Sequence, residues 1–269
     1  MASRHILTPT ARSGSRDTPA DHNARDLKLR FVARLVAEKP QSVLDVGAGD
    51  GLVIERLRRN GVAAFGLEPE YEPIHALVRS GQRGAVASAD SLPFDDDTFD
   101  WVAMRHVAHH LADPVRAFAE ANRVARRGVM VAEPWYDVSI PSQELGLAID
   151  LWRKRQHERT GRVHRPNLTA GEILAAQPEG AFGRVRIESL LDLRPVAAAE
   201  LEPKLNAEVV GLDREHADRV ELIELRKRLR DEGATYNGSL MVVLRRAVAA
   251  TGRGTRNESR WDVHRSRTP

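Results

Sequence analysis

The run VLDVGAGDG, residues 43–51, places two carboxylates and closely spaced glycines directly after a short apolar segment. Gly47 and Gly49 allow a sharp backbone turn with positive φ, and they leave no Cβ between the main chain and a ligand. The N–H groups at the start of the following helix point at whatever lies over the turn. The run therefore predicts a loop that holds a nucleotide-like ligand.

The charges around this loop argue against a phosphate. Asp45 and Asp50 flank the turn and would repel a pyrophosphate, whereas they would attract a cationic ligand. The fingerprint of dinucleotide-binding domains, G-x-G-x-x-G, is not met, because Gly51 is displaced and Leu52 stands in the last place. The sequence also has no G-x-x-x-x-G-K-S/T run, which excludes a P-loop. A dinucleotide or a nucleoside triphosphate is thus the wrong ligand for this loop.

The run resembles motif I of the class I S-adenosylmethionine-dependent methyltransferases, an acidic residue followed by any residue and G-x-G-x-G. The donor carries a sulfonium and an ammonium, which suits acid-flanked glycines. The resemblance implies that Asp45 holds the methionine amino group. It also implies that Glu68, about 20 residues further on, takes the ribose hydroxyls, and that Asp90 receives the adenine amino group. The residues expected to bind S-adenosylmethionine are Asp45, Gly47, Ala48, Gly49, Glu68, Pro69, Ala89, Asp90, Ser91 and Arg105.

The segment FDWVAMRHVAHHLADP, residues 99–114, resembles the fourth-strand region of the type 11 small-molecule subset of these enzymes. Enzymes of the superfamily that methylate amino groups of nucleic-acid bases carry D/N-P-P-Y/F at this place, and Met104–Val107 lacks it. The resemblance implies methyl transfer to oxygen or nitrogen of a small-molecule metabolite, with a natural product as one option. The alternatives are an RNA or protein methyltransferase and a non-catalytic descendant that still binds the cofactor.

An oxygen or nitrogen acceptor must lose a proton, and histidine is the natural base for that step. His106 and His110 are the catalytic candidates because they follow the fourth predicted strand, at the edge of the sheet where ligands gather. A structural role is the alternative for His110. His109 is expected to be solvated or to begin a helix. The pair of histidines has no third ligand at metal spacing, so no metal site is expected.

Three aromatic side chains are candidates for the wall of an apolar acceptor pocket: Trp135, Tyr136 and Trp152. Trp135 and Tyr136 follow a predicted strand, which favours a place near the cleft. Trp152 lies on the apolar face of a predicted helix, where packing in a core is the alternative. His157 and His164 lie close by in the sequence, and contact with substrate or a surface position are both open for them.

The elements that must position these residues alternate between apolar strands and amphipathic helices. Strands are predicted at 42–46, 63–67, 84–87, 99–104, 128–133, 184–191 and 239–245, and helices at 21–38, 51–60, 71–80, 142–159 and directly after Pro114. Strands that are almost wholly apolar are typical of a parallel sheet buried on both faces. The pattern predicts a doubly wound, mostly parallel α/β fold, and the resemblance implies a Rossmann-like sheet of seven strands whose last strand is antiparallel.

The segments 138–165 and 196–235 exceed a minimal methyltransferase and are expected to form helical lid insertions that exclude water and select the acceptor. A dimer interface is the alternative. The methyltransferase domain is expected to span residues 21–246, between a tail at 1–20 and a basic tail at 247–269, both disordered. The formal charge of +3 comes from the ends of the chain, since residues 1–20 carry +2 and residues 245–269 carry +5, which leaves about −4 for residues 21–244.

Composition narrows the class further. The chain has no cysteine, which excludes disulfides and methyltransferases that need a nucleophilic cysteine. No run approaches the about 20 apolar residues that span a bilayer, and no signal-peptide core follows Met1. The expectation is a cytoplasmic enzyme, monomeric or homodimeric, that acts on a small molecule and not on nucleic acid or a membrane.

Overall fold

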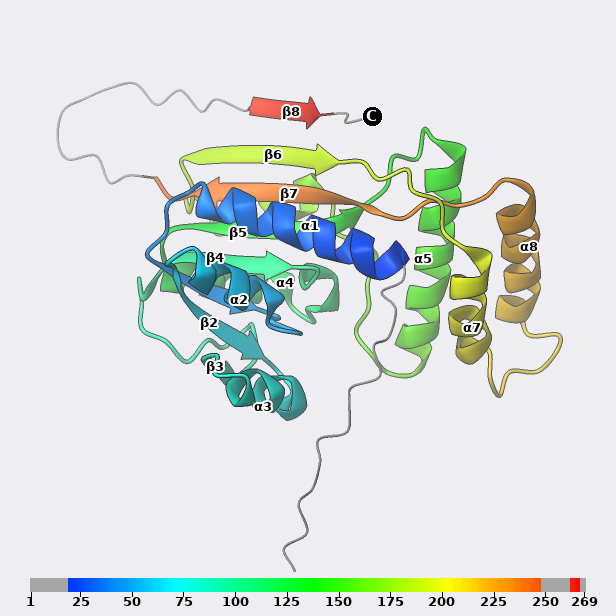
Figure 1. The fold of residues 1–269 in the computed structure, drawn as a ribbon, viewed down its shortest axis with the longest axis horizontal. Helices are drawn as coiled ribbons and strands as arrows, with labels where there is room; N and C mark the ends of the chain where they lie inside the picture. The colour runs from blue at the N-terminus through cyan, green and yellow to red at the C-terminus, as the bar shows by residue number, and fades with distance from the viewer. Residues whose placement is uncertain (1–18, 248–261, 267–269) are drawn as a thin grey trace, which may run out of the picture.

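The computed structural model describes residues 19–247 and 262–266, and its centre is one mixed sheet with helices on both faces (Figure 1). The strands lie in the order β3-β2-β1-β4-β5-β7-β6-β8. Their bounds are β1 Ser42–Val46, β2 Ala63–Glu68, β3 Gly84–Val86, β4 Phe99–Arg105, β5 Ala125–Trp135, β6 Arg184–Leu190, β7 Gly238–Arg245 and β8 Asp262–Ser266. The strands are added toward one edge of the sheet from β1 to β3 and toward the other edge from β4 onward, so the strand order switches between β1 and β4. β1 pairs in parallel with both β2 and β4. This is the predicted doubly wound fold, with β7 antiparallel to β5 and β6.

The eighth strand was not predicted. Asp262–Ser266 pairs in parallel with β6 and extends the sheet beyond the seven predicted strands. An exposed edge strand presents unpaired N–H and C=O groups, and β8 satisfies those of β6. The remainder of the two expected tails lies outside the described residues, apart from residues 19–20 at the start of the first helix and residue 247.

Nine helices occur in the described ranges, and most lie within two residues of the predicted positions. Their bounds are α1 Pro19–Val36, α2 Leu52–Arg59, α3 Tyr71–Arg79, the 3₁₀ helix η1 Ala108–His110, α4 Pro114–Val124, α5 Pro141–Arg159, α6 Ala170–Ala175, α7 Ala198–Glu208 and α8 Ala217–Asp231. A capping box opens α6, where Thr169 and Glu172 exchange side-chain and backbone hydrogen bonds. No helix in the part of the chain that the structure describes is long and apolar enough to cross a membrane.

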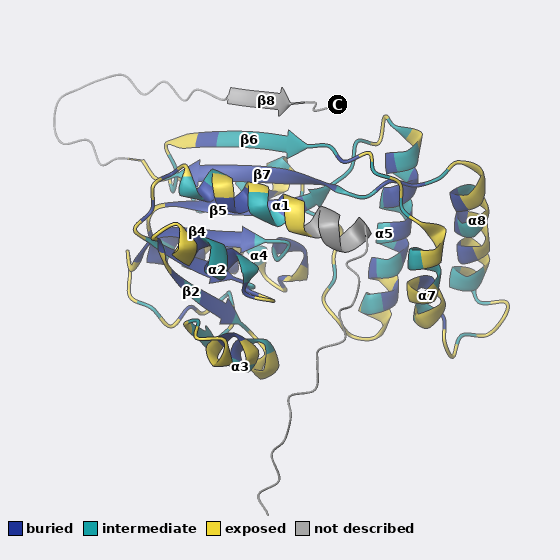
Figure 2. Cartoon of the chain, in the orientation of Figure 1, coloured by how far each residue is buried: buried dark blue, intermediate teal, exposed yellow. Residues whose placement is uncertain are grey.

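Successive residues of the central strands alternate between two hydrophobic cores, one on each face of the sheet. In β4, Val102 and Met104 pack with α4 and α6, while Trp101 and Ala103 pack with α1 and α2. Figure 2 shows β4 and β7 buried along nearly their whole length. Because both faces are covered, the carboxyl ends of the strands remain as the open edge where a ligand can bind.

A third core belongs to the predicted lid segments, whose helices α5, α7 and α8 lie beside one another beyond the carboxyl ends of β4 and β5 (Figure 1). We call these three helices the helical layer. The fully buried Trp152 lies at the centre of this core, and its indole Nε1 donates to the backbone O of Asp218 at 3.1 Å. The prediction that Trp152 walls an acceptor pocket is therefore wrong. The apolar face of α5 packs against α7 and α8. The periodicity of α5 predicts that this face is buried, but it does not predict which elements cover it.

Candidate active site

The glycine loop after β1 has the predicted backbone. Gly47, Gly49 and Gly51 all have positive φ, at 74°, 52° and 72°. The N–H of Gly47 donates to the backbone O of Leu67 at 2.8 Å, which ties the loop to the end of β2. A Cβ on Gly47 would lie 2.2 Å from Cγ2 of Val107. Glycine is thus required at position 47 both by φ and by the close approach of the segment after β4.

Asp45 is the most unusual carboxyl group of the site. It is buried at the end of β1, and its Oδ2 has no hydrogen-bond partner among the described residues. Burial, with the nearby carboxylate of Glu68, raises the pKa of Asp45 to about 7, although Arg105 and Lys28 oppose the shift. A buried, unpaired carboxyl group is costly unless a cation or donor meets it. The site therefore fits a ligand that carries an ammonium group.

Glu68 and Asp50 stabilise the glycine loop through polar contacts. Oε1 of Glu68 accepts the N–H of Gly49 at 2.5 Å, and burial raises the pKa of Glu68 despite this hydrogen bond. Asp50 is exposed and forms an ion pair of 2.6 Å with Nζ of Lys28 on α1. No local sequence pattern points to Lys28, because its contact with Asp50 joins a helix and a loop through residues 22 positions apart.

The larger of two cavities at this edge has a volume of about 750 Å³ and is lined by the ends of β1 and β2 and by residues 88–90, 106–107, 110–113 and 162–163. The predicted cofactor residues that line it are Gly47, Glu68, Pro69, Ala89 and Asp90. Asp45, Ala48 and Gly49 belong to the adjoining strand end and loop. Ser91 is not among the lining residues, and Arg105 lines the other cavity. Strand side chains alternate between faces, which turns Arg105 away from the larger cavity.

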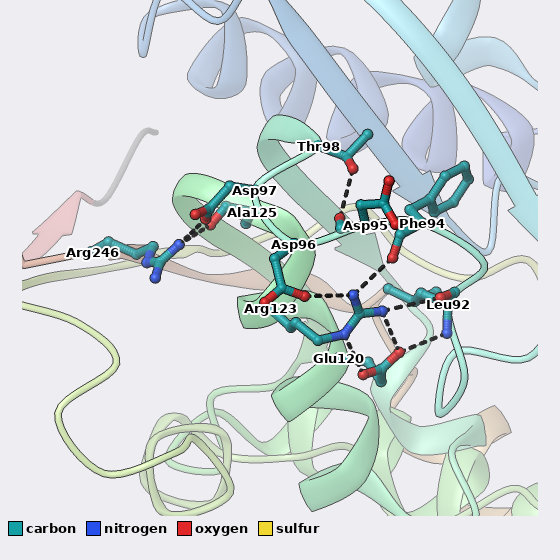
Figure 3. Close-up of polar contacts among 10 residues, drawn as sticks. All are labelled: Leu92, Phe94, Asp95, Asp96, Asp97, Thr98, Glu120, Arg123, Ala125 and Arg246. Carbon is teal, nitrogen blue, oxygen red and sulfur yellow. Dashed lines mark hydrogen bonds and ion pairs between the residues drawn. The ribbon is translucent and has the colours of Figure 1, made fainter.

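The loop that carries Asp90 is fixed to α4 by a compact polar network (Figure 3). The Arg123 guanidinium donates to the backbone O of Phe94 at 2.7 Å and of Leu92 at 3.1 Å, and it pairs with Glu120 at 2.7 Å. Glu120 in turn accepts the N–H of Leu92 at 2.8 Å. Next to this network, Nε of Arg116 donates to the backbone O of Asp90 at 2.9 Å. These bonds hold the Asp90 edge of the larger cavity in place.

The smaller cavity, of about 300 Å³, lies between the sheet edge and the helical layer. It is lined by Leu27, Arg105, His106, Tyr136, Gly146, Ile149, Asp150, Arg153, Val196, Glu200, Leu201, Lys204 and residues 234–237. Of the predicted wall residues, Tyr136 is present, whereas Trp135 packs against the sheet core. Tyr236, which lines the same cavity, donates its hydroxyl to Oε2 of Glu200 at 2.8 Å.

His106 lines both cavities, and the described residues share no other lining position between them. Its φ of 55° is rare for a residue with a side chain, and its Nε2 is buried without a hydrogen-bond partner in the described ranges. Burial, with the positive charge of Arg105, holds the pKa of His106 well below its usual range. The imidazole is therefore neutral at physiological pH.

The neighbouring Arg105 side chain is a buried cation facing the smaller cavity. Its Nε and Nη2 have no hydrogen-bond partner among the described residues. Burial lowers the pKa of Arg105 to about 10, although Asp45, Asp50 and Glu133 favour its charged form. A guanidinium in such a place is a ready receptor for an anionic or strongly hydrogen-bond-accepting group.

Of the two expectations for His109, a place in the first turn of a helix holds, since it lies in η1, and solvation does not. His109 is not solvated: it is buried, and its Nδ1 lies 2.7 Å from Oε2 of the fully buried Glu133. His110 is the exposed member of the pair and lines the larger cavity. His164, far along the chain, lies beside both rings and supplies the third metal-type ligand that local spacing lacks. The prediction of no metal site rested on the spacing of histidines along the sequence. That spacing does not detect His164, because it reaches the other two histidines only through the tertiary fold.

The sequence matches the model of a methyltransferase domain family over residues 44–132. Among curated proteins, a protein of Mycobacterium sp. (strain JLS) named uncharacterized methyltransferase is 35% identical over 143 residues, which are 51% of this chain and 56% of that protein. A protein of the same name from Mycolicibacterium vanbaalenii is 33% identical over 144 residues, with 50% and 56% covered. The chain thus spans about half the length of the curated relatives it matches.

Solved structures share the fold at low sequence identity. The YcgJ protein from Bacillus subtilis has a TM-score of 0.56 and 17% identity, with 82% of this chain and 100% of that chain covered. A cyclase, SpnF, has a TM-score of 0.53 and 18% identity, with 85% and 84% covered. A SAM-dependent methyltransferase from Archaeoglobus fulgidus has a TM-score of 0.50 and 16% identity, with 81% and 94% covered. At these identities the likeness establishes the fold and no particular reaction.

Proposed function

Because this chain contains a type 11 domain of the class I S-adenosylmethionine-dependent methyltransferase family, we propose that it is an enzyme that methylates an oxygen or nitrogen of a small molecule. In this proposal the larger cavity binds S-adenosylmethionine and the smaller cavity binds the acceptor. The observation that carries the proposal is His106, the residue that lines both cavities. Methyl transfer is an in-line displacement, so donor and acceptor sites must meet at one point.

The residues around the glycine loop suit the donor. The unpaired carboxyl group of Asp45 would receive the ammonium of the methionine end, and the ionised form of Asp45 would be stabilised by that contact. Glu68 and Asp90 would hold the ribose and the adenine, as the family resemblance implies, at the walls of the larger cavity. Bound S-adenosylmethionine supplies a methyl group activated by its sulfonium.

His106 would act on the acceptor's proton. A neutral imidazole offers a lone pair that can accept a proton or a hydrogen bond from an acceptor hydroxyl or amine. The depressed pKa of His106 keeps that lone pair free before the acceptor binds. His110 lines the larger cavity away from the smaller one, so we assign the proton step to His106 alone.

The size and charge of the smaller cavity favour a small acceptor with an anionic group. A volume of about 300 Å³ lies at the lower end of the range for small-molecule sites. Nε and Nη2 of Arg105, which have no hydrogen-bond partner in the described ranges, would pair with a carboxylate of the acceptor. Ile149, Leu201 and Tyr136 give the same cavity an apolar wall.

The test is methyl transfer from labelled S-adenosylmethionine into host extract separated into metabolite, RNA and protein fractions. We expect label in the metabolite fraction, and a strong reduction when His106→Asn replaces the wild type at equal protein concentration. Label confined to RNA or protein would contradict the assignment of a small acceptor.

A variant with an intact donor site makes the result specific. Arg105→Met removes the cation of the smaller cavity and leaves the lining of the larger cavity unchanged. We expect this variant to bind S-adenosylhomocysteine within about threefold of the wild type and to label metabolites at least about tenfold more slowly, since a lost charge-assisted hydrogen bond costs about 1.5–3 kcal/mol. Binding of S-adenosylhomocysteine without any label transfer by the wild type would favour a non-catalytic cofactor-binding protein.

A further inference from the structure

A cluster of histidine side chains lies where the segment after β4 meets the end of α5 and residues 160–168 that follow it. We propose that His109, His110 and His164 form a binding site for a divalent transition-metal ion of the Zn²⁺ type. One ring nitrogen from each of the three histidines lies within 4.8 Å of the others. The site goes beyond methyl transfer and needs neither donor nor acceptor to form.

The histidines converge from distant parts of the chain. His109 and His110 belong to η1, and their ring centroids are 4.3 Å apart. The ring of His164 lies 5.3 Å from that of His109 and 4.4 Å from that of His110. The cluster thus joins a buried ring, an exposed ring and a half-buried ring from two segments more than 50 residues apart in the sequence.

The hydrogen bonds on one side of each ring set the tautomers. Nδ1 of His109 faces the Glu133 carboxylate at 2.7 Å, and Nδ1 of His110 faces the backbone O of Val163 at 3.1 Å. Both oxygens are acceptors only, so each Nδ1 carries the proton and each Nε2 keeps a lone pair. A histidine in this state is a metal ligand whose orientation is already fixed.

His164 reaches the same state through a relay. Nε2 of His157 donates to Oε1 of Glu208 at 2.9 Å, which leaves Nδ1 of His157 as an acceptor. When His157 is neutral, Nδ1 of His164, which lies 2.6 Å from that atom, carries the proton. The free lone pair of His164 is thus on Nε2, as in the other two histidines.

Carboxylates behind the rings balance the charge of a divalent cation. Glu133 contacts His109 in the carboxylate–histidine arrangement typical of zinc ligands, and Glu208 contacts His157, which in turn contacts His164. The buried ammonium of Lys154 forms an ion pair with Asp150 at 3.0 Å, which partly offsets its charge. Tetrahedral zinc places its nitrogen ligands roughly 3.3 Å apart, so the rings need to close by only about 1.5 Å, within the reach of small side-chain rotations.

A bound ion would cross-link two parts of the molecule. His109 and His110 are held by the sheet edge, whereas His164 follows Arg162 and Val163, which line the larger cavity. Three protein ligands leave a fourth position open, as in zinc sites that bind water or another small ligand. The ion would therefore fasten residues 162–164 over the wall of the larger cavity.

Calorimetric titration of zinc chloride alone into untagged, chelator-stripped full-length protein tests this site. We expect one ion per chain with a Kd of about 10 μM or lower. His164→Asn should weaken binding at least about 100-fold, because it removes one of three ligands. His75→Asn, on α3 and away from the cluster, is the matched control and should leave the Kd unchanged.

Two further variants keep the proposal open to refutation should His164→Asn not fold. His110→Asn replaces an exposed proposed ligand. Glu133→Gln replaces the carboxylate that contacts His109 and should weaken zinc binding about 10- to 100-fold. A cobalt-loaded sample should show the intense visible absorption of a tetrahedral site, and His110→Asn should abolish it. Absence of binding at about 100 μM zinc, or equal affinity in folded His110→Asn or His164→Asn protein, would overturn the proposal.

Discussion

The sheet edge around the glycine loop and the helical layer of α5, α7 and α8 hold the two halves of the candidate active site by different means. At the sheet edge, backbone geometry does most of the work: positive φ at Gly47 and a glycine N–H bound by Glu68 shape the larger cavity. In the helical layer, side chains from three helices pack into a core of their own and frame the smaller cavity. Variation in the second region can therefore change the acceptor without disturbing the donor site.

Trp152→Ala separates the two regions most strongly. The side chain is fully buried at the centre of the helical layer, so its loss should lower the free energy of unfolding by about 3–5 kcal/mol. Urea denaturation measures this change. Amide hydrogen exchange should accelerate in α5, α7 and α8 and stay unchanged in β1 and β4. Uniform acceleration across the sheet would mean that the two regions unfold as one unit.

The pH dependence of stability reports on the sheet edge through Asp45. Its pKa of about 7 in the folded protein exceeds the ordinary value of 3.8, so the folded protein retains a proton that the unfolded chain releases between these pH values. The free energy of unfolding should therefore fall as pH rises from about 4 to about 7, by at most about 4 kcal/mol, and then level off. Asp45→Asn should flatten this fall in urea denaturation at a series of pH values. An unchanged slope in the variant would contradict an unpaired buried carboxyl group.

Gly47→Ala tests the backbone side of the comparison. The added Cβ meets Val107 at 2.2 Å and the residue must keep a φ of 74°, so the loop has to move. We expect S-adenosylhomocysteine affinity to fall by about 100-fold, or about 3 kcal/mol, in calorimetric titration. Gly61→Ala is the control: φ is 77° there, but the Cβ would meet nothing within 4 Å. Its strain should cost about 1–2 kcal/mol of stability with no loss of affinity. Equal affinity losses in both variants would point to general destabilisation.

His106→Asn probes the point where the two regions meet. Loss of the imidazole should slow label transfer about 100-fold, a typical contribution of a general base, or about 2.7 kcal/mol. S-adenosylhomocysteine affinity should change less than about threefold, since His106 lies at the end of the larger cavity that adjoins the smaller one. His75→Asn again serves as control. Parallel loss of affinity and transfer would make His106 a cofactor-binding residue instead of the proton acceptor.

The sheet edge could be predicted from the sequence more fully than the contacts between elements that pack against each other. The strands follow from apolar runs, and the carboxyl ends of parallel strands share one edge, so Gly47, Glu68 and Asp90 could be brought together from their positions alone. The contacts of His109 with Glu133 and of Lys28 with Asp50 link residues 24 and 22 positions apart. No periodicity records such pairs, because they depend on how whole elements dock.

Trp152 and Arg105 illustrate the same limit within correctly predicted elements. The helix of Trp152 and the strand of Arg105 are where the sequence predicts them. Which neighbour covers an apolar helix face, and toward which cavity the last residue of a strand points, are decided by tertiary packing. Because tertiary packing of the helical layer shapes the smaller cavity, local sequence patterns do not predict the identity of the acceptor.

A crystal structure of the protein with S-adenosylhomocysteine tests the central claim most directly, namely that donor and acceptor cavities meet at His106. The account predicts the ligand in the larger cavity, with its amino group at Asp45, its adenine at Asp90 and its sulfur toward His106, while the smaller cavity stays free. Ligand density in the smaller cavity, or a sulfur turned away from His106, would contradict the account.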